Sequence, residues 1–134
     1  MSITALSALV ATLTLAAPGA DEGPAGGGTS QENAIATVPA GIVDGPTARR
    51  LLAAGAVVID VRTAREFASG HVPEAKNIPH DEIAARAPEI GPPQTPVVVY
   101  CSSGRRSAIA AAELKRLGYS RIWDVRSYAR WREH

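Results

Sequence analysis

The stretch VVVYCSSGRRSAIAAAELKRLG, residues 97–118, decides the fold of this protein. It opens with a run of β-branched residues, which is typical of a buried strand. It continues into residues that favour a helix, mostly Ala, Leu, Glu, Lys and Arg, and this helix is expected to stop at Gly118. Between the two elements lies a short loop that begins at Cys101, the single cysteine of the chain. The stretch therefore predicts a strand, a loop and a helix, with a thiol where the strand ends.

The flanking sequence repeats this alternation of strands and helices. Apolar runs predict strands at 56–61, 75–79, 95–101 and 120–125. Helix-forming segments, several bounded by Pro or Gly, predict helices at 45–55, 63–70, 80–88, 104–118 and 127–134. Alternating units of this kind build a parallel sheet with helices on both faces, so the predicted class is α/β. Such sheets bind ligands at the carboxyl ends of their strands, where Cys101 stands.

The N-terminal part differs in composition from the rest of the chain. Residues 1–17 are apolar and uncharged and resemble the core of a secretory signal peptide, although no Lys or Arg precedes them and Pro18 disturbs the cleavage region. We expect a signal peptide at 1–20, a flexible Gly-rich linker at 21–40 and a folded domain at 41–134. The expected location is therefore periplasmic or secreted. The alternative is a cytoplasmic protein whose apolar N-terminal helix packs on the domain, and no run is long enough for a membrane span.

Composition narrows the classes of function. The chain of 134 residues has a formal net charge of +1, which argues against a nucleic-acid binder. From Val97 onward, eight Lys and Arg stand against three Asp and Glu, so the field near Cys101 should favour small anions. The alternative is that these arginines lie on solvated helix faces. A single cysteine leaves no internal disulfide or multi-cysteine zinc site, and the three histidines lack ligand spacing. We expect no metal, no cofactor and a monomer.

The loop after the strand contains groups that stabilise a thiolate, which is the reactive form of cysteine. It enters the N-terminus of a long helix, where the helix dipole is positive. Small residues let successive backbone N–H groups face an anion, and two arginines add charge. The loop residues after Cys101 are Ser102, Ser103, Gly104, Arg105 and Arg106. We expect Cys101 to be a nucleophile, the alternative being an inert buried thiol.

Loop length separates two reactions that use such a cysteine. Cysteine phosphatases surround a phosphoryl group with a C-x5-R loop. Here the residue at the arginine position is Ser107, and the two arginines come one and two residues too early. The loop is thus short for a tetrahedral oxyanion and suits one extra sulfur atom on Cys101. A small phosphatase or an arsenate reductase remains the less favoured alternative.

Two signatures in the chain resemble those of the single-domain rhodanese family of sulfurtransferases, most closely its small periplasmic members. VVIDVRTAREFASGHVPEAKNIP (57–79) matches D-V-R-x3-E-(F/Y)-x2-G-H-(I/V)-P-x-A-x-N-I-P, and the loop matches C-x-x-G-x-R-S. The resemblance runs from about Gly41 and implies a three-layer α/β/α sandwich with a small, mostly parallel central sheet. It also implies a six-residue active loop, Cys101 to Arg106, whose N–H groups hold a Cys101 persulfide. Cys101 would take sulfur from thiosulfate or a persulfide and pass it to cyanide or a thiol.

Other residues of the signatures receive supporting roles from the resemblance. Asp60, Arg62 and Glu66 are expected to form one salt-bridge network that holds the loop between the first strand and its helix, the alternative being direct contact with the substrate. His71 is expected to bond a backbone group rather than act as a base, since persulfide exchange needs no obligatory base. Ser107 is expected to cap the helix that follows the active loop.

One segment departs from the family pattern, which has two glycines, three residues and a tryptophan after the last strand. Trp131 stands at the right spacing, but Arg126 and Ser127 replace the glycines. Glycines permit positive φ and close approach to the active loop, so the replacement should alter the mouth of the pocket and place a cation there. It also keeps open a non-catalytic module that binds a sulfur carrier or a partner protein.

Overall fold

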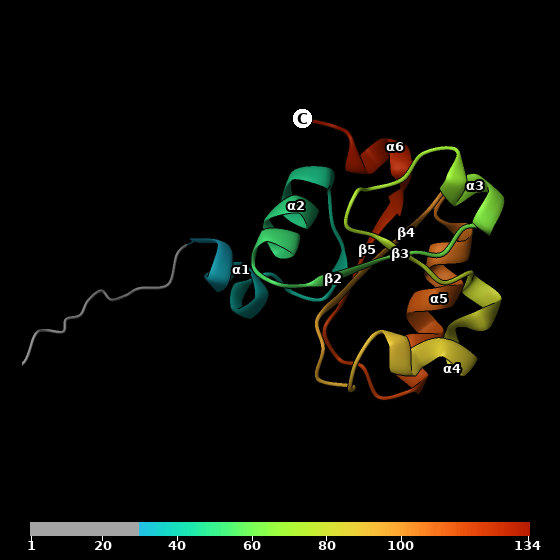
Figure 1. Ribbon diagram of the computed structural model, residues 1–134. Helices are drawn as coiled ribbons and strands as arrows, with labels where there is room; N and C mark the ends of the chain where they lie inside the picture. The colour runs from blue at the N-terminus through green and yellow to red at the C-terminus, as the bar shows by residue number, and fades with distance from the viewer. Residues whose placement is uncertain (1–29) are drawn as a thin grey trace, which may run out of the picture.

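The computed structural model describes residues 30–134, which form one parallel sheet between two layers of helices (Figure 1). The strand order is β1-β5-β4-β2-β3, and every neighbouring pair is parallel. The strands are β1 (Gly41–Ile42), β2 (Val57–Asp60), β3 (Lys76–Asn77), β4 (Val97–Cys101) and β5 (Ile122–Ser127). The helices are α1 (Ser30–Thr37), α2 (Gly45–Ala53), α3 (Ala64–Ala68), α4 (Ile83–Arg86), α5 (Arg105–Arg116) and α6 (Tyr128–Trp131), with 3-10 turns η2 (His80–Glu82) and η3 (Ala87–Glu89). The predicted α/β sandwich is confirmed.

The central strand β4 divides the core into two halves. All five of its residues are buried, and successive side chains point to opposite faces of the sheet. Val98 and Tyr100 pack in the core half with buried residues of α1, α2 and α6. Val97, Val99 and Cys101 pack in the other half, with buried residues of α4 and α5. The thiol therefore lies on the face of the sheet that α5 covers, at the carboxyl end of the strand.

The first helix of the described residues begins earlier than the domain that the sequence predicts. Residues 30–37 form α1 instead of a flexible linker, and Ala34 is buried against the core. The helix is held to the domain by its following loop, because the indole N–H of Trp123 donates to the carbonyl groups of Val38 and Pro39. The expected signal peptide and residues 21–29 of the expected linker lie outside the described residues. Between residues 30 and 134, no helix is long and apolar enough to span a membrane.

An irregularity in β5 shapes the sheet edge next to Cys101. Val99 pairs with Asp124, but Tyr100 pairs with Arg126, so Val125 is an extra residue in β5. Such a bulge bends the strand and redirects the residues that follow it. Arg126 takes up the bend with φ of 81°, in the left-handed region. The bulge brings the Arg126 carbonyl to the end of β4.

Candidate active site

The active loop is a tight connection between β4 and α5. It begins at Cys101, and α5 starts at Arg105 with Gly104 as its N-terminal cap residue. Gly104 has φ of +97°, and a Cβ at this position would lie 2.5 Å from Nε of Arg126. Glycine is therefore required at position 104 for two reasons, the positive φ of the backbone and the close approach of the Arg126 side chain.

The Cys101 thiol is buried and hydrogen-bonded on two sides. The backbone N–H of Gly104 donates to Sγ at 2.9 Å, and the thiol donates to the carbonyl of Arg126 at 3.3 Å. Burial acts to raise the pKa of Cys101, but hydrogen bonds from the backbone and hydroxyl of Ser107 and from the N–H groups of Gly104 and Ser103 outweigh it. The pKa of the thiol is thus below its ordinary value, which favours the thiolate.

Ser107 supports the loop from inside the first turn of α5. The sequence-based expectation that it caps the helix is wrong, because the helix begins two residues earlier. Its buried hydroxyl donates to the carbonyl of Gly104 at 3.1 Å and lies 3.4 Å from that of Arg126. This side chain therefore joins the active loop to the bulge of β5.

Glu66 pairs with the last residue of the active loop. Its two carboxylate oxygens accept hydrogen bonds from Arg106 at 2.7 and 2.9 Å, and the Ser102 hydroxyl donates to it at 3.2 Å. At the same time Glu66 completes a capping box with Thr63 at the start of α3. The hydrogen bond from Arg106 holds the pKa of Glu66 far below its usual range. Glu66 thus ties α3 to the active loop and neutralises the charge of Arg106.

Asp60 and Arg62 form a separate buried pair, which corrects the expected single network with Glu66. The guanidinium of Arg62 donates to the Asp60 carboxylate at 2.6 Å and to the carbonyl of Gly70 at 2.7 Å. It also lies 5.0 Å from the ring centroid of Tyr128. These contacts fix the connection after β2. Sequence spacing alone could not assign the partners, because Arg62 and Arg106 are each compatible with Asp60 or with Glu66.

The side chains of the remaining predicted residues do not touch the thiol, which Ser103 reaches only through its backbone N–H. Nδ1 of His71 bonds the carbonyl of Phe67 at 2.8 Å, and the two rings stack with centroids 3.6 Å apart. Ser103 and Arg105 are exposed, and their side chains make no hydrogen bond or ion pair within residues 30–134. Over the same residues there is no group of His, Cys, Asp and Glu side chains that could hold a metal ion.

Asp124 belongs to the site's framework, although sequence analysis gave it no role. It is buried in β5, and its carboxylate accepts the backbone N–H of Arg126 at 2.8 Å. Ser127 then caps α6 by accepting the N–H of Arg130 at 3.0 Å. The sequence does contain a signal for this role, namely a carboxylate within an apolar strand. A buried acid needs a hydrogen-bond donor close by.

Comparison with known proteins gives a consistent family assignment. The Rhodanese-like domain model matches residues 46–134. A sulfurtransferase of Allochromatium vinosum is 39% identical over 79 residues, covering 58% of this chain and 73% of the relative. Thiosulfate sulfurtransferase 18 of Arabidopsis thaliana is 34% identical over 106 residues, covering 69% of this chain and 78% of the relative.

Solved structures agree with this assignment. The human single-domain sulfurtransferase TSTD1 superposes with a TM-score of 0.60 at 29% identity, covering 72% of this chain and 99% of that one. A rhodanese from E. coli, solved with anions, gives a TM-score of 0.54 at 32% identity, covering 56% of this chain and 89% of that one. The relatives support a sulfurtransferase role in general terms, and the chain belongs to the rhodanese-like domain family.

Proposed function

We propose that the protein is a rhodanese-type sulfurtransferase in which Cys101 carries the transferred sulfur as a persulfide. The observation that carries this proposal is the environment of Sγ, which a backbone N–H approaches at 2.9 Å and whose pKa is lowered by its hydrogen bonds. A thiolate in such a site attacks sulfur readily, whereas an ordinary thiol is mostly protonated at neutral pH.

The transfer takes two displacements at sulfur. The Cys101 thiolate attacks the outer sulfur of thiosulfate, the S–S bond of the donor breaks, and sulfite leaves with the electron pair. The persulfide formed on Cys101 keeps one negative charge. Cyanide or a thiolate then attacks its outer sulfur, and the Cys101 thiolate leaves with the electron pair. No external oxidant or reductant is needed, and thiosulfate as donor is suggested by the printed name of the Arabidopsis relative.

The loop geometry supports sulfur transfer over phosphoryl transfer. Arg106 is held by both oxygens of Glu66, so its guanidinium is not free to surround a phosphoryl group. The backbone N–H groups of Gly104, Ser103 and Ser107 are the donors directed at the sulfur. They suit a single added atom with one negative charge.

The test is intact mass spectrometry of the protein before and after exposure to thiosulfate, with thiocyanate measured after cyanide is added. We expect a gain equal to one sulfur atom on Cys101, its loss on adding cyanide, and an equal yield of thiocyanate. The Cys101→Ser variant should gain nothing. If the wild type gains no sulfur from thiosulfate or from glutathione persulfide, the proposed function is wrong.

A further inference from the structure

Arg126 has an unusual backbone conformation at the point where β5 reaches the active loop. It is the one non-glycine residue with positive φ among residues 30–134, at 81°. A left-handed conformation is unfavourable for a long side chain, and such strain persists where the surroundings fix it. Here the N–H is held by Asp124, and the carbonyl faces both Cys101 and Ser107. The backbone of Arg126 is therefore fixed beside the thiol.

The guanidinium of Arg126 lies directly against the active loop. Its Nε and Cζ are 2.5 and 3.1 Å from the position of a Cβ on Gly104, whose own N–H binds Sγ. The side chain is half-buried and also borders a cavity of about 670 Å3, together with Lys115 and Asp124. Cys101 does not line this cavity, whereas Arg126 both borders it and contacts the thiol through its backbone carbonyl.

Pairing and burial together distinguish Arg126 from the other arginines near the loop, because Arg105 has no partner within residues 30–134 but is exposed. Arg62 is paired with Asp60, and Arg106 is paired with Glu66. The guanidinium of Arg126 has no hydrogen bond, ion pair or ring contact within residues 30–134. A half-buried cation without an acceptor, held beside a nucleophilic sulfur, is suited to receive an oxyanion from solution.

We propose that Arg126 binds the sulfonate group of thiosulfate-type donors and thereby sets the preference of the site for donors whose distal group is charged. The inference rests on the proposed sulfur transfer at Cys101. In that reaction the bond between the two donor sulfurs breaks and the distal group departs as sulfite with the electron pair. Negative charge therefore grows on the atoms that Arg126 would bind, and a fixed guanidinium stabilises it. A donor whose distal group is neutral gains less from this contact.

Two donors differ in the charge of this distal group, which leaves as sulfite from thiosulfate and as methanesulfinate from methanethiosulfonate. Thiosulfate carries a charged distal oxygen where methanethiosulfonate carries a methyl group, and both present the same outer sulfur. We expect the ratio of kcat/KM for thiosulfate to kcat/KM for methanethiosulfonate to fall about tenfold or more in Arg126→Gln. Arg126→Lys should keep most of the ratio. Arg126→Asn, which tolerates the left-handed conformation, is a second neutral variant in case the first does not fold.

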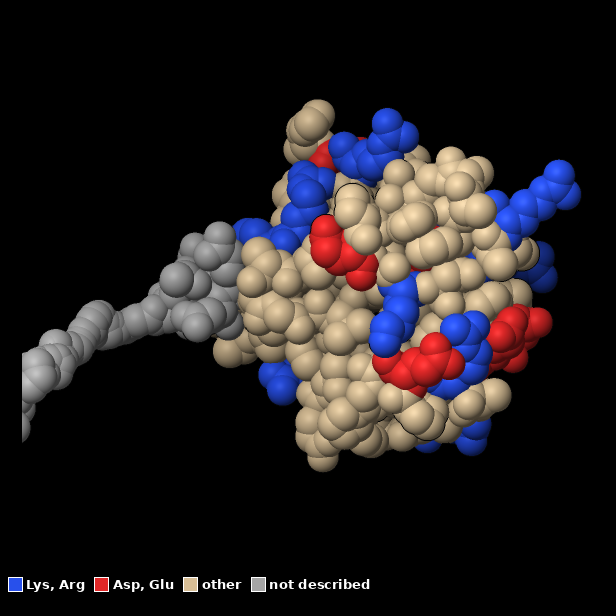
Figure 2. Space-filling model, in the orientation of Figure 1, with Lys and Arg blue, Asp and Glu red and all other residues tan. Residues whose placement is uncertain are grey.

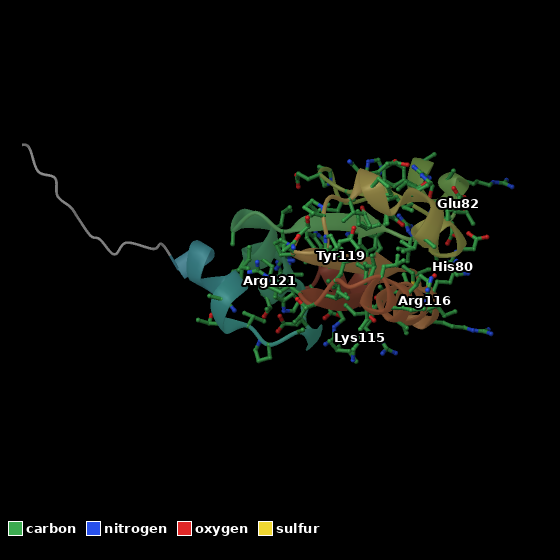
Figure 3. All side chains as sticks on the ribbon, turned by 90° about the horizontal axis from the view of Figure 1, so that it is seen from below. His80, Glu82, Lys115, Arg116, Tyr119 and Arg121 are labelled. Carbon is green, nitrogen blue, oxygen red and sulfur yellow. The ribbon has the colours of Figure 1, made fainter. Side chains whose placement is uncertain are left out.

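Arg116→Gln is the matched control, because it removes the same charge from the C-terminal end of α5. Arg116 is exposed and pairs with Glu113, and Figure 3 labels it on α5. It should leave the donor ratio unchanged. An unchanged donor ratio in Arg126→Gln would overturn the proposal. If kcat/KM fell by the same factor with both donors, the role of Arg126 would be purely structural.

Sulfate binding separates this inference from the proposed function. Chemical shifts of the active loop are followed by NMR during titration with inorganic sulfate, in the wild type and in Arg126→Gln. We expect saturable shifts in the wild type that weaken about tenfold or more in the variant. If sulfate binds through Arg126 but no donor forms a persulfide, the proposed function fails and the anion site stands. If sulfate binding is equal in both proteins, the anion site itself is refuted.

Discussion

Replacing Gly104 by Ala tests how closely the active loop and β5 are packed. The added Cβ meets two unfavourable conditions, a φ of +97° and contact with Arg126. The left-handed conformation costs a non-glycine residue about 1–2 kcal/mol. Overpacking costs about 1–3 kcal/mol more, and the lower end applies because Nε belongs to a flexible side chain. We expect Gly104→Ala to lower the free energy of unfolding by about 2–4 kcal/mol.

Arg126→Gly is the second arm of a double-mutant cycle. The three atoms nearest to the position of a Cβ on Gly104 are all side-chain atoms of Arg126, at 2.5, 3.1 and 3.2 Å. Removing that side chain should leave only the conformational cost, so Gly104→Ala should then cost about 1–2 kcal/mol. The expected coupling is about 1–2 kcal/mol.

The cycle is measured by urea unfolding with tryptophan fluorescence, since Trp123 and Trp131 are both buried. Equal slopes of free energy against urea in all four proteins would show that the unfolded states are comparable. If Gly104→Ala costs the same in both backgrounds to within about 0.5 kcal/mol, Arg126 does not contact the loop as described.

Three further changes probe the rest of the site. Ser107→Ala should raise the pKa of Cys101, so its rate of alkylation by iodoacetamide should reach half-maximum at higher pH than in the wild type. Glu66→Gln should lower stability at pH 7 by up to about 1 kcal/mol, because the pair is partly exposed. Since the pKa of Glu66 is lowered on folding, this difference should be present above the unfolded pKa of about 4.3 and disappear as the pH falls through the folded value, as followed by urea unfolding. Asp60→Asn should cost about 3–5 kcal/mol in the same assay, because it leaves a buried guanidinium uncompensated, and a cost below about 1 kcal/mol would contradict the buried pair.

The sequence predicted the sheet because its strands have a local signal. Val97 to Tyr100 and Val57 to Ile59 are short β-branched or aromatic runs that can be read without tertiary information, and the alternation with helices implies parallel pairing. Strand β1 has only two residues, and its pairing to β5 comes from tertiary contact. Helix α1 depends likewise on packing, since its own segment has little apolar content beyond Ala34 and Ile35.

The sequence indicates which residues surround Cys101 but not how they pair. The position of Cys101 follows from the end of β4, and its reactive environment follows from the loop of small residues. The partner of Glu66 does not follow, because it depends on how α3 is oriented relative to α5, some 40 residues later. The bulge at Val125 is also invisible in sequence, since one extra residue in a strand leaves the hydrophobic pattern nearly intact.

Charge at the site is determined by which cations are paired rather than by how many are present. The excess of Lys and Arg after Val97 suggests a broadly positive field, yet Figure 2 shows basic and acidic side chains interspersed over the face in view. Arg106 is neutralised by Glu66, although it belongs to the active loop itself. Arg126, from the neighbouring strand, has no such partner within residues 30–134. The selectivity of the site for anions would then come from the segment that departs from the family pattern, which is why the donor ratio should respond to Arg126 and not to Arg116.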